Sequence, residues 1–352
     1  MTNIDESPQY LTQQGRQSMQ TSSIKLTKVD VVATSSVIPE VELQRGLQIL
    51  LRLGFDCKLA TNLLAADFAY AGSVDERASA FYQAALTDSQ IVWAVRGGYG
   101  AAQLLESLSQ LTAEHGVPAK KLLIGYSDIT ALYQFVSEHW GWDILHASMV
   151  SSQDLQSLYQ EDQLALLSFI DRRSGKARWD GQPLNWISQV KMHSDTVIKG
   201  QLYGGNLAVI CSLIGTPWQL DFSNKILFIE EIGESWSKID RLLQQLHLSS
   251  SLKTCKGIIL GHFSHCLDAS PKGLAAEDKD LLVELRPVLT PEQALYQVFS
   301  RFSALTCLAV CAGLPIGHIK HNAPLPLLAH YELSISKGLV FSHWQSREEG
   351  SN

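Results

Sequence analysis

The feature that most constrains the fold is a regular alternation of short apolar runs with amphipathic segments through residues 29–146. The apolar runs predict buried strands, and the segments between them carry apolar residues at helical spacing. The expected strands are 29–33, 55–59, 91–95, 122–124 and 144–146, and the expected helices are 39–53, 75–86, 101–108 and 128–138. Strands that alternate with helices in this way form a parallel sheet with helices on both faces, so the sequence predicts an α/β fold.

A second alternation begins after a less regular stretch. Strands are expected at 225–229, 257–261, 308–310, 331–336 and 339–342, and helices at 208–213, 239–246 and 294–303. A chain of 352 residues is also long for one compact unit. We therefore predict a disordered polar tail (1–27), an N-terminal α/β domain (28–150), an interdomain connection (151–196) and a smaller C-terminal α/β domain (197–345).

Composition argues against several classes of partner. The formal net charge is −7 and no long basic run is present, which argues against nucleic acid or an anionic membrane surface as the main partner. No apolar run is long enough to span a bilayer, and the N-terminal tail lacks the apolar core of a signal peptide. The six scattered cysteines fit reduced thiols better than a disulfide framework, so we expect a cytoplasmic protein.

The strongest candidate for chemistry is Ser127, at the tip of a predicted strand-to-helix turn. The run 122–124 ends at Gly125, and a helix is expected to begin near Asp128. A serine on such a turn is exposed at the end of a sheet, where free backbone N–H groups and the helix dipole favour a nucleophilic hydroxyl. Serine is also a common helix N-cap, so this stretch alone fits either role. Only the first half of the G-x-S-x-G motif is present, because Ile129 occupies the second glycine position.

A nucleophilic serine needs a general base, and the base needs a carboxylate to orient it. Glu230 follows the apolar run 225–229, and His318 follows a Gly-Leu-Pro-Ile-Gly turn. Both are expected at the ends of strands, so folding could bring them to Ser127. The pattern favours a Ser-Glu-His triad, formed across the two predicted domains, as one hypothesis.

Two backbone N–H groups are candidates for an oxyanion hole. One belongs to Asp128, after the serine, and the other to Gly98 in the Arg-Gly-Gly-Tyr-Gly loop at 96–100. A glycine loop between a strand and a helix can also bind phosphate. Here Gln103 replaces the last glycine of the dinucleotide motif, and the Lys-Ser/Thr pair of a phosphate-binding loop is missing. We therefore expect no nucleotide cofactor.

The sequence offers no convincing metal site. His262, His265 and Cys266 lie close together, as do Cys307 and Cys311, but neither group has a second well-spaced pair of ligands. We expect no metal ion and no other cofactor.

Four residues are candidates for substrate binding. Arg96 and Arg241 could bind a free carboxylate, although Arg96 could equally be a structural tie beneath the glycine loop. His146 ends a predicted strand near the carboxyl edge of the first sheet, where ligands of parallel sheets bind, although a structural role is the more common one for such a histidine. Asn206 directly precedes the predicted second-domain helix.

Five groups of residues, taken in order, resemble the motifs of one family. They are the loop at 96–100, Gly-Tyr-Ser-Asp-Ile-Thr at 125–130, Gly-Gly-Asn-Leu at 204–207, Ile-Leu-Phe-Ile-Glu-Glu at 226–231, and Gly-His at 317–318 with Asn322 and Leu-Pro at 325–326. The chain from about residue 29 to residue 333 thus resembles the LD-carboxypeptidases. These serine peptidases include the muramoyl-tetrapeptide carboxypeptidases and the microcin C immunity proteins.

The resemblance implies a role for each member of the triad. By position, Ser127 matches the nucleophile, Glu230 the orienting carboxylate and His318 the general base. It implies an N-terminal α/β sandwich, a smaller C-terminal α/β domain and a homodimer, with no metal or cofactor. The implied reaction releases terminal D-alanine from an L,D bond of a small murein tetrapeptide during cell-wall recycling.

Two other functions remain open at this point. An immunity-type enzyme would cleave an amide between an aminoacyl group and an adenylate-like toxin. Trp179 or Trp186 of the connecting segment could stack on its base, although such residues also pack loops onto a protein. The second alternative is a non-catalytic ligand-binding protein of the same fold, against which the intact triad residues argue.

The chain departs from the family pattern at three places. Ala147 and Ser148 follow His146 where the family has Gly-Pro, and Leu328 stands where a glycine usually follows Leu-Pro-Leu. The insertion after Cys266 is also longer than expected. These departures concern the shape of the pocket, and none falls on a triad position.

Overall fold

The computed structural model describes residues 26–171, 175–187, 193, 195–266 and 290–344. Most of the predicted polar tail and the insertion after Cys266 lie outside these residues. The first strand begins at Thr27, although the sequence predicts that the polar tail extends to residue 27.

The first sheet has six strands in the order β11-β5-β4-β3-β1-β2. Its strands are β1 (Thr27–Val32), β2 (Phe55–Leu59), β3 (Ile91–Ala94), β4 (Leu122–Ile124), β5 (Asp143–His146) and β11 (Leu325–Leu327). β1 to β5 are parallel to their neighbours, and β11 pairs with β5 in the antiparallel direction. The predicted parallel α/β arrangement is therefore confirmed.

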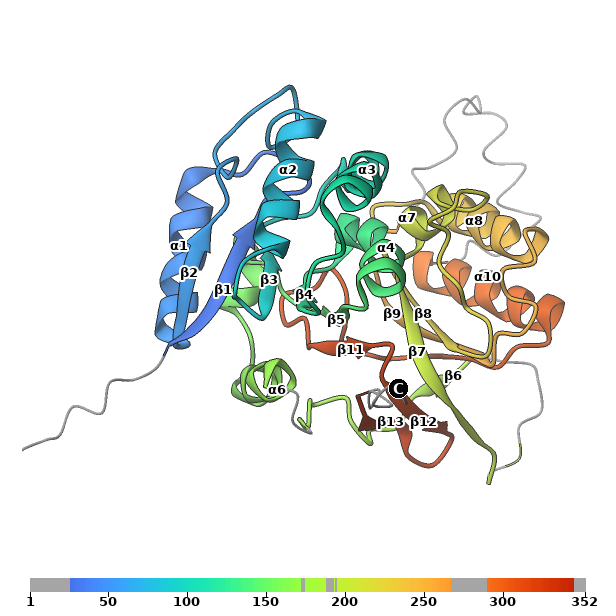
Figure 1. The fold of residues 1–352 in the computed structure, drawn as a ribbon. Helices are drawn as coiled ribbons and strands as arrows, with labels where there is room; N and C mark the ends of the chain where they lie inside the picture. Colours follow the sequence, from blue (N-terminus) through green and yellow to red (C-terminus); the bar gives the residue numbers. More distant parts are fainter. Residues whose placement is uncertain (1–25, 172–174, 188–192, 194, 267–289, 345–352) are drawn as a thin grey trace, which may run out of the picture.

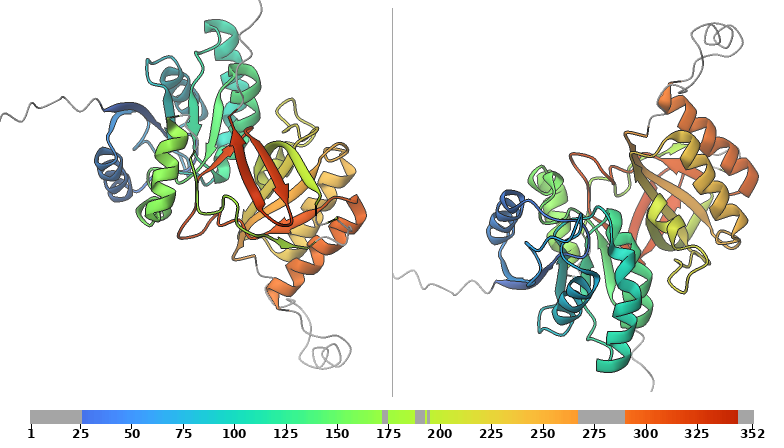
Figure 2. Two further views of the ribbon diagram at one scale, coloured as in Figure 1. Left: turned by 90° about the horizontal axis from the view of Figure 1, so that it is seen from below. Right: turned by 90° about the horizontal axis from the view of Figure 1, so that it is seen from above.

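Helices cover both faces of this sheet. They are α1 (Glu40–Arg52), α2 (Val74–Ala85), α3 (Leu105–His115) and α4 (Thr130–Trp140). α1 lies on one face, whereas α2 and α3 pack against each other on the opposite face (Figures 1 and 2). Local chemistry sets their ends: Ser73 and Glu76 form a capping box at the start of α2, and Gly54, with φ of 90°, follows α1.

The second sheet has seven strands in the order β13-β12-β7-β8-β9-β10-β6. Its strands are β6 (Asn185–Trp186), β7 (Val197–Asn206), β8 (Ile226–Ile232), β9 (Gly257–Ser264), β10 (Val310–Ala312), β12 (His330–Ser334) and β13 (Gly338–His343). β7 to β10 are parallel, and the flanking strands are antiparallel. Its helices are α7 (Leu207–Ser212), α8 (Trp236–Leu248) and α10 (Pro291–Thr306) (Figure 1).

The chain crosses between the two sheets more often than the sequence predicts. β11 comes from the C-terminal part of the chain but joins the first sheet, beside β5. The connecting segment contains α5 (Gln153–Gln156) and α6 (Gln160–Ile170), and its β6 joins the second sheet beside β10. β6 and β11 are too short to show a periodic pattern, and Pro326 is tolerated because β11 is an edge strand.

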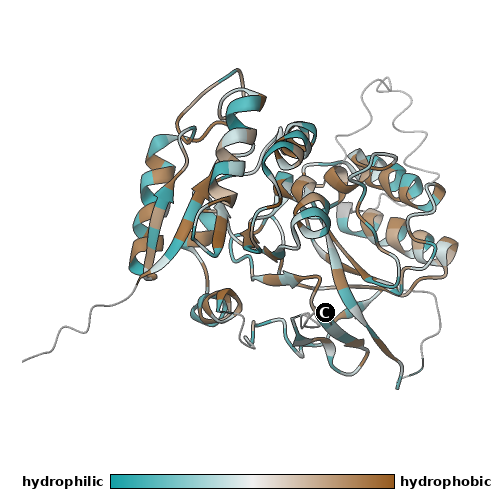
Figure 3. Ribbon diagram, viewed as in Figure 1, coloured by the Kyte–Doolittle hydropathy of each residue, from teal (hydrophilic) through white to brown (hydrophobic). Residues whose placement is uncertain are grey.

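Apolar residues are concentrated on the strands and on parts of the helices (Figure 3). The largest buried ones include Trp93, Trp142 and Trp179. Within the described ranges, none of the helices combines the length and apolar character that crossing a bilayer requires.

The contact between Gly205 of β7 and Thr130 of α4 yields a test of how closely the two units pack. A Cβ atom on Gly205 would lie 2.5 Å from the Thr130 Oγ1 atom, and the φ of Gly205 is +156°. We expect Gly205→Ala to lower the free energy of unfolding by about 1–3 kcal/mol more than Gly215→Ala. Gly215 also has a positive φ, but a Cβ there would meet nothing within 4 Å. Urea unfolding of both variants measures the difference, and equal losses would contradict close packing at Gly205.

Candidate active site

Ser127 lies on a sharp turn between β4 and a 3₁₀ turn, Ser127–Ile129, that leads into α4. Its φ is +63°, which is uncommon for a residue other than glycine and is typical of a nucleophile held at the tip of a turn. The N-cap is Tyr126, without a side-chain capping bond. The Ser127 hydroxyl is instead 2.9 Å from the Nε2 atom of His318, so the N-cap alternative is wrong.

Glu230 and His318 complete a chain of hydrogen bonds to Ser127. The Nδ1 atom of His318 is 2.7 Å from the Oε2 atom of Glu230, whose side chain is fully buried. Glu230 does not follow its strand, as the sequence suggested, but lies within β8, which continues to Ile232. The structure therefore brings the three predicted residues together, with the serine from the first sheet and the acid from the second.

The electrostatics of the Glu230–His318 pair follow from its burial and proximity. Burial alone would raise the pKa of the Glu230 carboxyl, but the His318 imidazole beside it holds that pKa below its usual value. Burial alone would lower the pKa of His318, but the Glu230 carboxylate, with smaller contributions from Glu231 and Asp154, raises it above 6.5. Glu230 thus stays ionised and increases the proton affinity of the imidazole.

A cavity of about 360 Å³ opens at the Ser127 hydroxyl. Four of the predicted site residues line it together with Ser127 and His318, namely Arg96, Gly98, Asp128 and Asn206. Arg241 of α8 is not among the lining residues. The cavity is therefore bounded by the glycine loop on one side and by the start of α7 on the other.

The glycine loop is held rigidly beside the serine. The Ser36 hydroxyl accepts a hydrogen bond from the Tyr99 N–H (3.1 Å), and the Asp128 carboxylate accepts one from the Ala101 N–H (2.9 Å). The guanidinium of Arg77, which is fully buried, donates to the Gly100 carbonyl (2.8 Å). Sequence analysis missed Ser36 and Arg77, since neither belongs to a motif.

Gly97, which the sequence did not single out as a site residue, lies directly against the serine. A Cβ atom there would lie 3.0 Å from the Ser127 Cβ atom and 3.1 Å from its Oγ atom. A larger residue at 97 would therefore crowd the nucleophile.

Arg96 and Asn206, which were both predicted to bind substrate, differ in the contacts that their side chains already make. Arg96 is partly exposed, donates a long hydrogen bond to the Val37 carbonyl (3.4 Å), and lies 3.9 Å from the Glu42 carboxylate. The Asn206 amide instead donates to Glu231 (3.0 Å) and accepts from the Val209 N–H at the start of α7 (3.2 Å). Asn206 thus shapes the cavity wall, whereas the contacts of Arg96 are long and its side chain is 43% exposed, so both roles predicted for Arg96 stay open.

His146 lies beneath the site and does not line the cavity. It is fully buried between the rings of Tyr126 and Phe228, with centroid distances of 5.3 and 5.2 Å. Burial lowers its pKa to about 4, so it is neutral at physiological pH. The expectation that His146 binds substrate is not met by this placement.

The two tryptophans of the connecting segment do not line the cavity either. Trp179 is 1% exposed, and its indole N–H donates to the Pro324 carbonyl (2.9 Å). Trp186 lies in β6 opposite Cys311. Both pack the connecting segment onto the protein, which was the alternative role expected for them.

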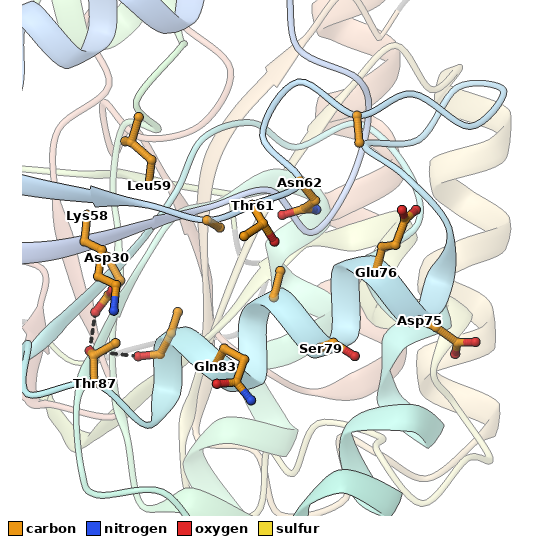
Figure 4. Close-up of a pocket in the computed structure, with 14 residues that line it drawn as sticks. Asp30, Lys58, Leu59, Thr61, Asn62, Asp75, Glu76, Ser79, Gln83 and Thr87 are labelled. Atoms are coloured by element: carbon orange, nitrogen blue, oxygen red, sulfur yellow. Dashed lines mark hydrogen bonds between the residues drawn. The ribbon is translucent and has the colours of Figure 1, made fainter.

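A larger cavity of about 710 Å³ lies between β2, the loop after it and α2 (Figure 4). Its polar lining includes Asp30, which accepts a hydrogen bond from Thr87 (2.5 Å), and Asn62. Its described lining residues include the hydroxyl groups of Thr61, Ser79 and Thr87 but no histidine, so none of these hydroxyls has an imidazole base within the cavity lining. Across the described part of the chain, no group of three or more His, Cys, Asp or Glu side chains could hold a metal ion.

Comparison with known proteins identifies a family for this chain. Residues 29–147 match the profile of the LD-carboxypeptidase N-terminal domain, and residues 199–333 match that of the LD-carboxypeptidase C-terminal domain. A candidate carboxypeptidase of Rickettsia conorii is 37% identical over 51% of this chain, which spans only 55% of that relative. The murein tetrapeptide carboxypeptidase of Pseudomonas aeruginosa is 27% identical over 85% of this chain and 90% of its own length.

A solved structure shows the same fold. The muramoyltetrapeptide carboxypeptidase of Oxalobacter formigenes superposes with a TM-score of 0.67 and 27% identity, over 91% of this chain and all of the other. Both domain profiles occur in the family order, and the fold is shared along nearly the whole chain. The chain therefore belongs to the LD-carboxypeptidase family.

Proposed function

We propose that this protein is a serine carboxypeptidase that hydrolyses an L,D-peptide bond and releases terminal D-alanine from a murein tetrapeptide. The observation that carries the proposal is the hydrogen-bonded chain from Ser127 through His318 to Glu230, at 2.9 and 2.7 Å. The names of the relatives from Pseudomonas aeruginosa and Oxalobacter formigenes support the substrate class. A cytoplasmic location and a homodimer stay predictions from the sequence.

In the proposed mechanism, His318 removes the proton of the Ser127 hydroxyl as its oxygen attacks the amide carbonyl. Glu230 orients the imidazole and stabilises its charged form, which is consistent with the raised pKa of His318. The backbone N–H groups of Gly98 and Asp128 stabilise the oxyanion, a contribution of about 3–4 kcal/mol per donor in other enzymes. His318 then protonates the leaving amine, and water hydrolyses the acyl-enzyme.

The structure bears on both rival functions. Tyr99 is an exposed aromatic residue in the cavity lining, so its ring could stack on a base. The immunity-type reaction would be favoured by an aromatic ring free to stack on a base, but Trp179 is buried and hydrogen-bonded to Pro324. A non-catalytic ligand-binding protein would have no need for the strained backbone at Ser127 or its hydrogen bond to His318. We therefore propose the carboxypeptidase reaction, and the substrate test below decides between it and the immunity-type reaction.

The substrate is tested by mass spectrometry with two compounds in parallel. These are L-Ala-γ-D-Glu-meso-diaminopimelate-D-Ala and an aminoacyl-sulfamoyl adenosine. We expect loss of D-alanine from the tetrapeptide alone, no turnover by Ser127→Ala, and normal turnover by Ser137→Ala, a serine of α4 that does not line the cavity. Cleavage of the adenosine compound alone would replace the carboxypeptidase assignment with an immunity-type hydrolase.

The role of Arg96 is tested with the same tetrapeptide and its C-terminal amide. If Arg96 binds the terminal carboxylate, Arg96→Ala should raise KM for the acid about 10- to 100-fold, the loss expected for a charge-assisted hydrogen bond. KM for the amide should change little, and Arg52→Ala, an exposed arginine of α1, should change neither value. An equal rise in KM for both compounds would argue against carboxylate binding by Arg96.

The Glu230–His318 pair predicts how activity depends on pH. His318 acts as a base only when neutral, so kcat/KM of the wild type should fall as pH drops through the raised pKa of His318, above 6.5. In Glu230→Gln this pKa should fall, and the acid limb should move to lower pH, while kcat/KM drops about 10³- to 10⁴-fold. Glu332→Gln, which removes a surface carboxylate paired with Lys199, is the control. An acid limb that stays in place in Glu230→Gln would contradict the role of Glu230.

A further inference from the structure

A second buried carboxylate lies beside the triad and has no part in the mechanism above. It belongs to Asp154 of α5, whose side chain is 5% exposed. The Ser148 hydroxyl and the Asn322 amide N–H both donate to its Oδ2 atom, at 2.9 and 3.0 Å. Burial raises the pKa of Asp154, and the hydrogen bonds oppose that rise.

Asn322 connects this carboxylate to the loop that carries the general base. Asn322 is fully buried, and its Oδ1 atom accepts a hydrogen bond from the N–H of Gly317 (2.9 Å). Gly317 directly precedes His318 and has a φ of +122°, and a Cβ there would lie 2.9 Å from the Oε2 atom of Glu230. The backbone at His318 is therefore fixed by Asn322 and by close packing on Glu230.

Asp154 also interacts with the residue next to the nucleophile. Tyr126 directly precedes Ser127, and its ring centroid lies 4.9 Å from that of His318. Burial, then the charges of Asp154 and Glu230, raises the pKa of Tyr126. The same carboxylate thus interacts with the neighbour of the nucleophile and, through Asn322, with the neighbour of the base.

The rest of this loop is also held by the connecting segment. The ring of His321 stacks on that of Tyr159, with 4.2 Å between the ring centroids. The backbone carbonyl of His321 accepts a hydrogen bond from the Arg178 guanidinium. Trp179 donates to the Pro324 carbonyl. The connecting segment therefore contacts the chain on both sides of Asn322, and Asp154 bonds to Asn322 itself.

We propose that Asp154 is a positioning residue for the general base, acting on His318 through Asn322 and Gly317. The proposal rests on the proposed function, because it requires His318 to serve as the base for Ser127. The titratable groups that face His318 are Glu230 and Glu231 of β8, Asp154 of α5, His146 of β5 and Tyr126. Like Glu230 and Glu231, Asp154 raises the pKa of His318 through its negative charge. Asp154 is also connected to the backbone before His318 by the hydrogen bonds of Asn322.

The test measures how fast a fluorophosphonate probe labels Ser127 in the full chain, as a function of pH. Labelling needs the serine and its base but no murein peptide, so its outcome is independent of the substrate. We expect Asn322→Ala and Asp154→Ala to slow labelling about 10- to 100-fold, the cost of a base displaced by about 1 Å. Asp154→Asn keeps an oxygen that can accept from Asn322, so it should restore most of the rate.

The pH profile separates positioning from simple stabilisation. Asp154→Asn removes a charge that raises the pKa of His318, so the acid limb of labelling should move to lower pH. Ser137→Ala removes a hydroxyl of α4 that bonds to the Gln134 carbonyl, and it should leave the rate and the acid limb unchanged. Melting temperatures of all variants identify any that are unfolded, and Asp154→Asn remains the informative variant if the alanine variants do not fold.

The outcomes distinguish this proposal from the proposed function. A wild-type rate in folded Asn322→Ala, or an unmoved acid limb in Asp154→Asn, would overturn the role of Asp154 and leave the triad standing. Labelling that behaves as expected without any release of D-alanine would overturn only the proposed substrate. Failure of the wild-type protein to react with the probe would overturn both proposals.

Discussion

The structure depends on one buried interaction, the hydrogen bond between the Glu230 carboxylate and the His318 imidazole. A carboxylate with no exposure to water is strongly destabilised unless a charged or hydrogen-bonding partner compensates for the lost hydration. His318 is that partner, and it in turn has the Ser127 hydroxyl on its other nitrogen. Because the serine comes from the first sheet and the carboxylate from the second, this alignment exists only if the two sheets are held at a fixed distance.

Three kinds of contact hold the sheets in place. β11 follows the His318 loop and adds to the edge of the first sheet, so the chain that carries the base is hydrogen-bonded to β5. At the centre of the junction, the Asn206 N–H donates to the Thr130 hydroxyl (3.1 Å), where Gly205 allows the two backbones to approach. Farther out, the Tyr203 hydroxyl bonds to the Gln134 side chain (3.2 Å). An active site assembled from two sheets needs this rigidity, since small displacements are costly to catalysis.

Sequence reasoning succeeds where a residue's role follows from its local pattern. The parallel strands of the first sheet follow from short apolar runs, and the turn at Ser127 follows from the run 122–124 that ends at Gly125; the structure has them at those positions. Sequence reasoning does not predict β6 and β11, because these strands consist of only two and three residues. They are defined by the strands they pair with rather than by a pattern of their own. Arg77 and Asp154 were missed for the same reason, because a buried charge is recognised only by the groups that surround it.

The two histidines on either side of Tyr126 show most clearly what the sequence does not contain. His146 and His318 each lie within about 5 Å of the Tyr126 ring, and both interact with Glu230. Burial dominates for His146, whose ring nitrogens have no hydrogen-bond partner among the described residues, and its pKa falls to about 4. His318 bonds directly to Glu230, and its pKa rises. The proton affinity that a general base needs therefore comes from one direct hydrogen bond to a carboxylate, and the fold gives that bond to His318 rather than to His146.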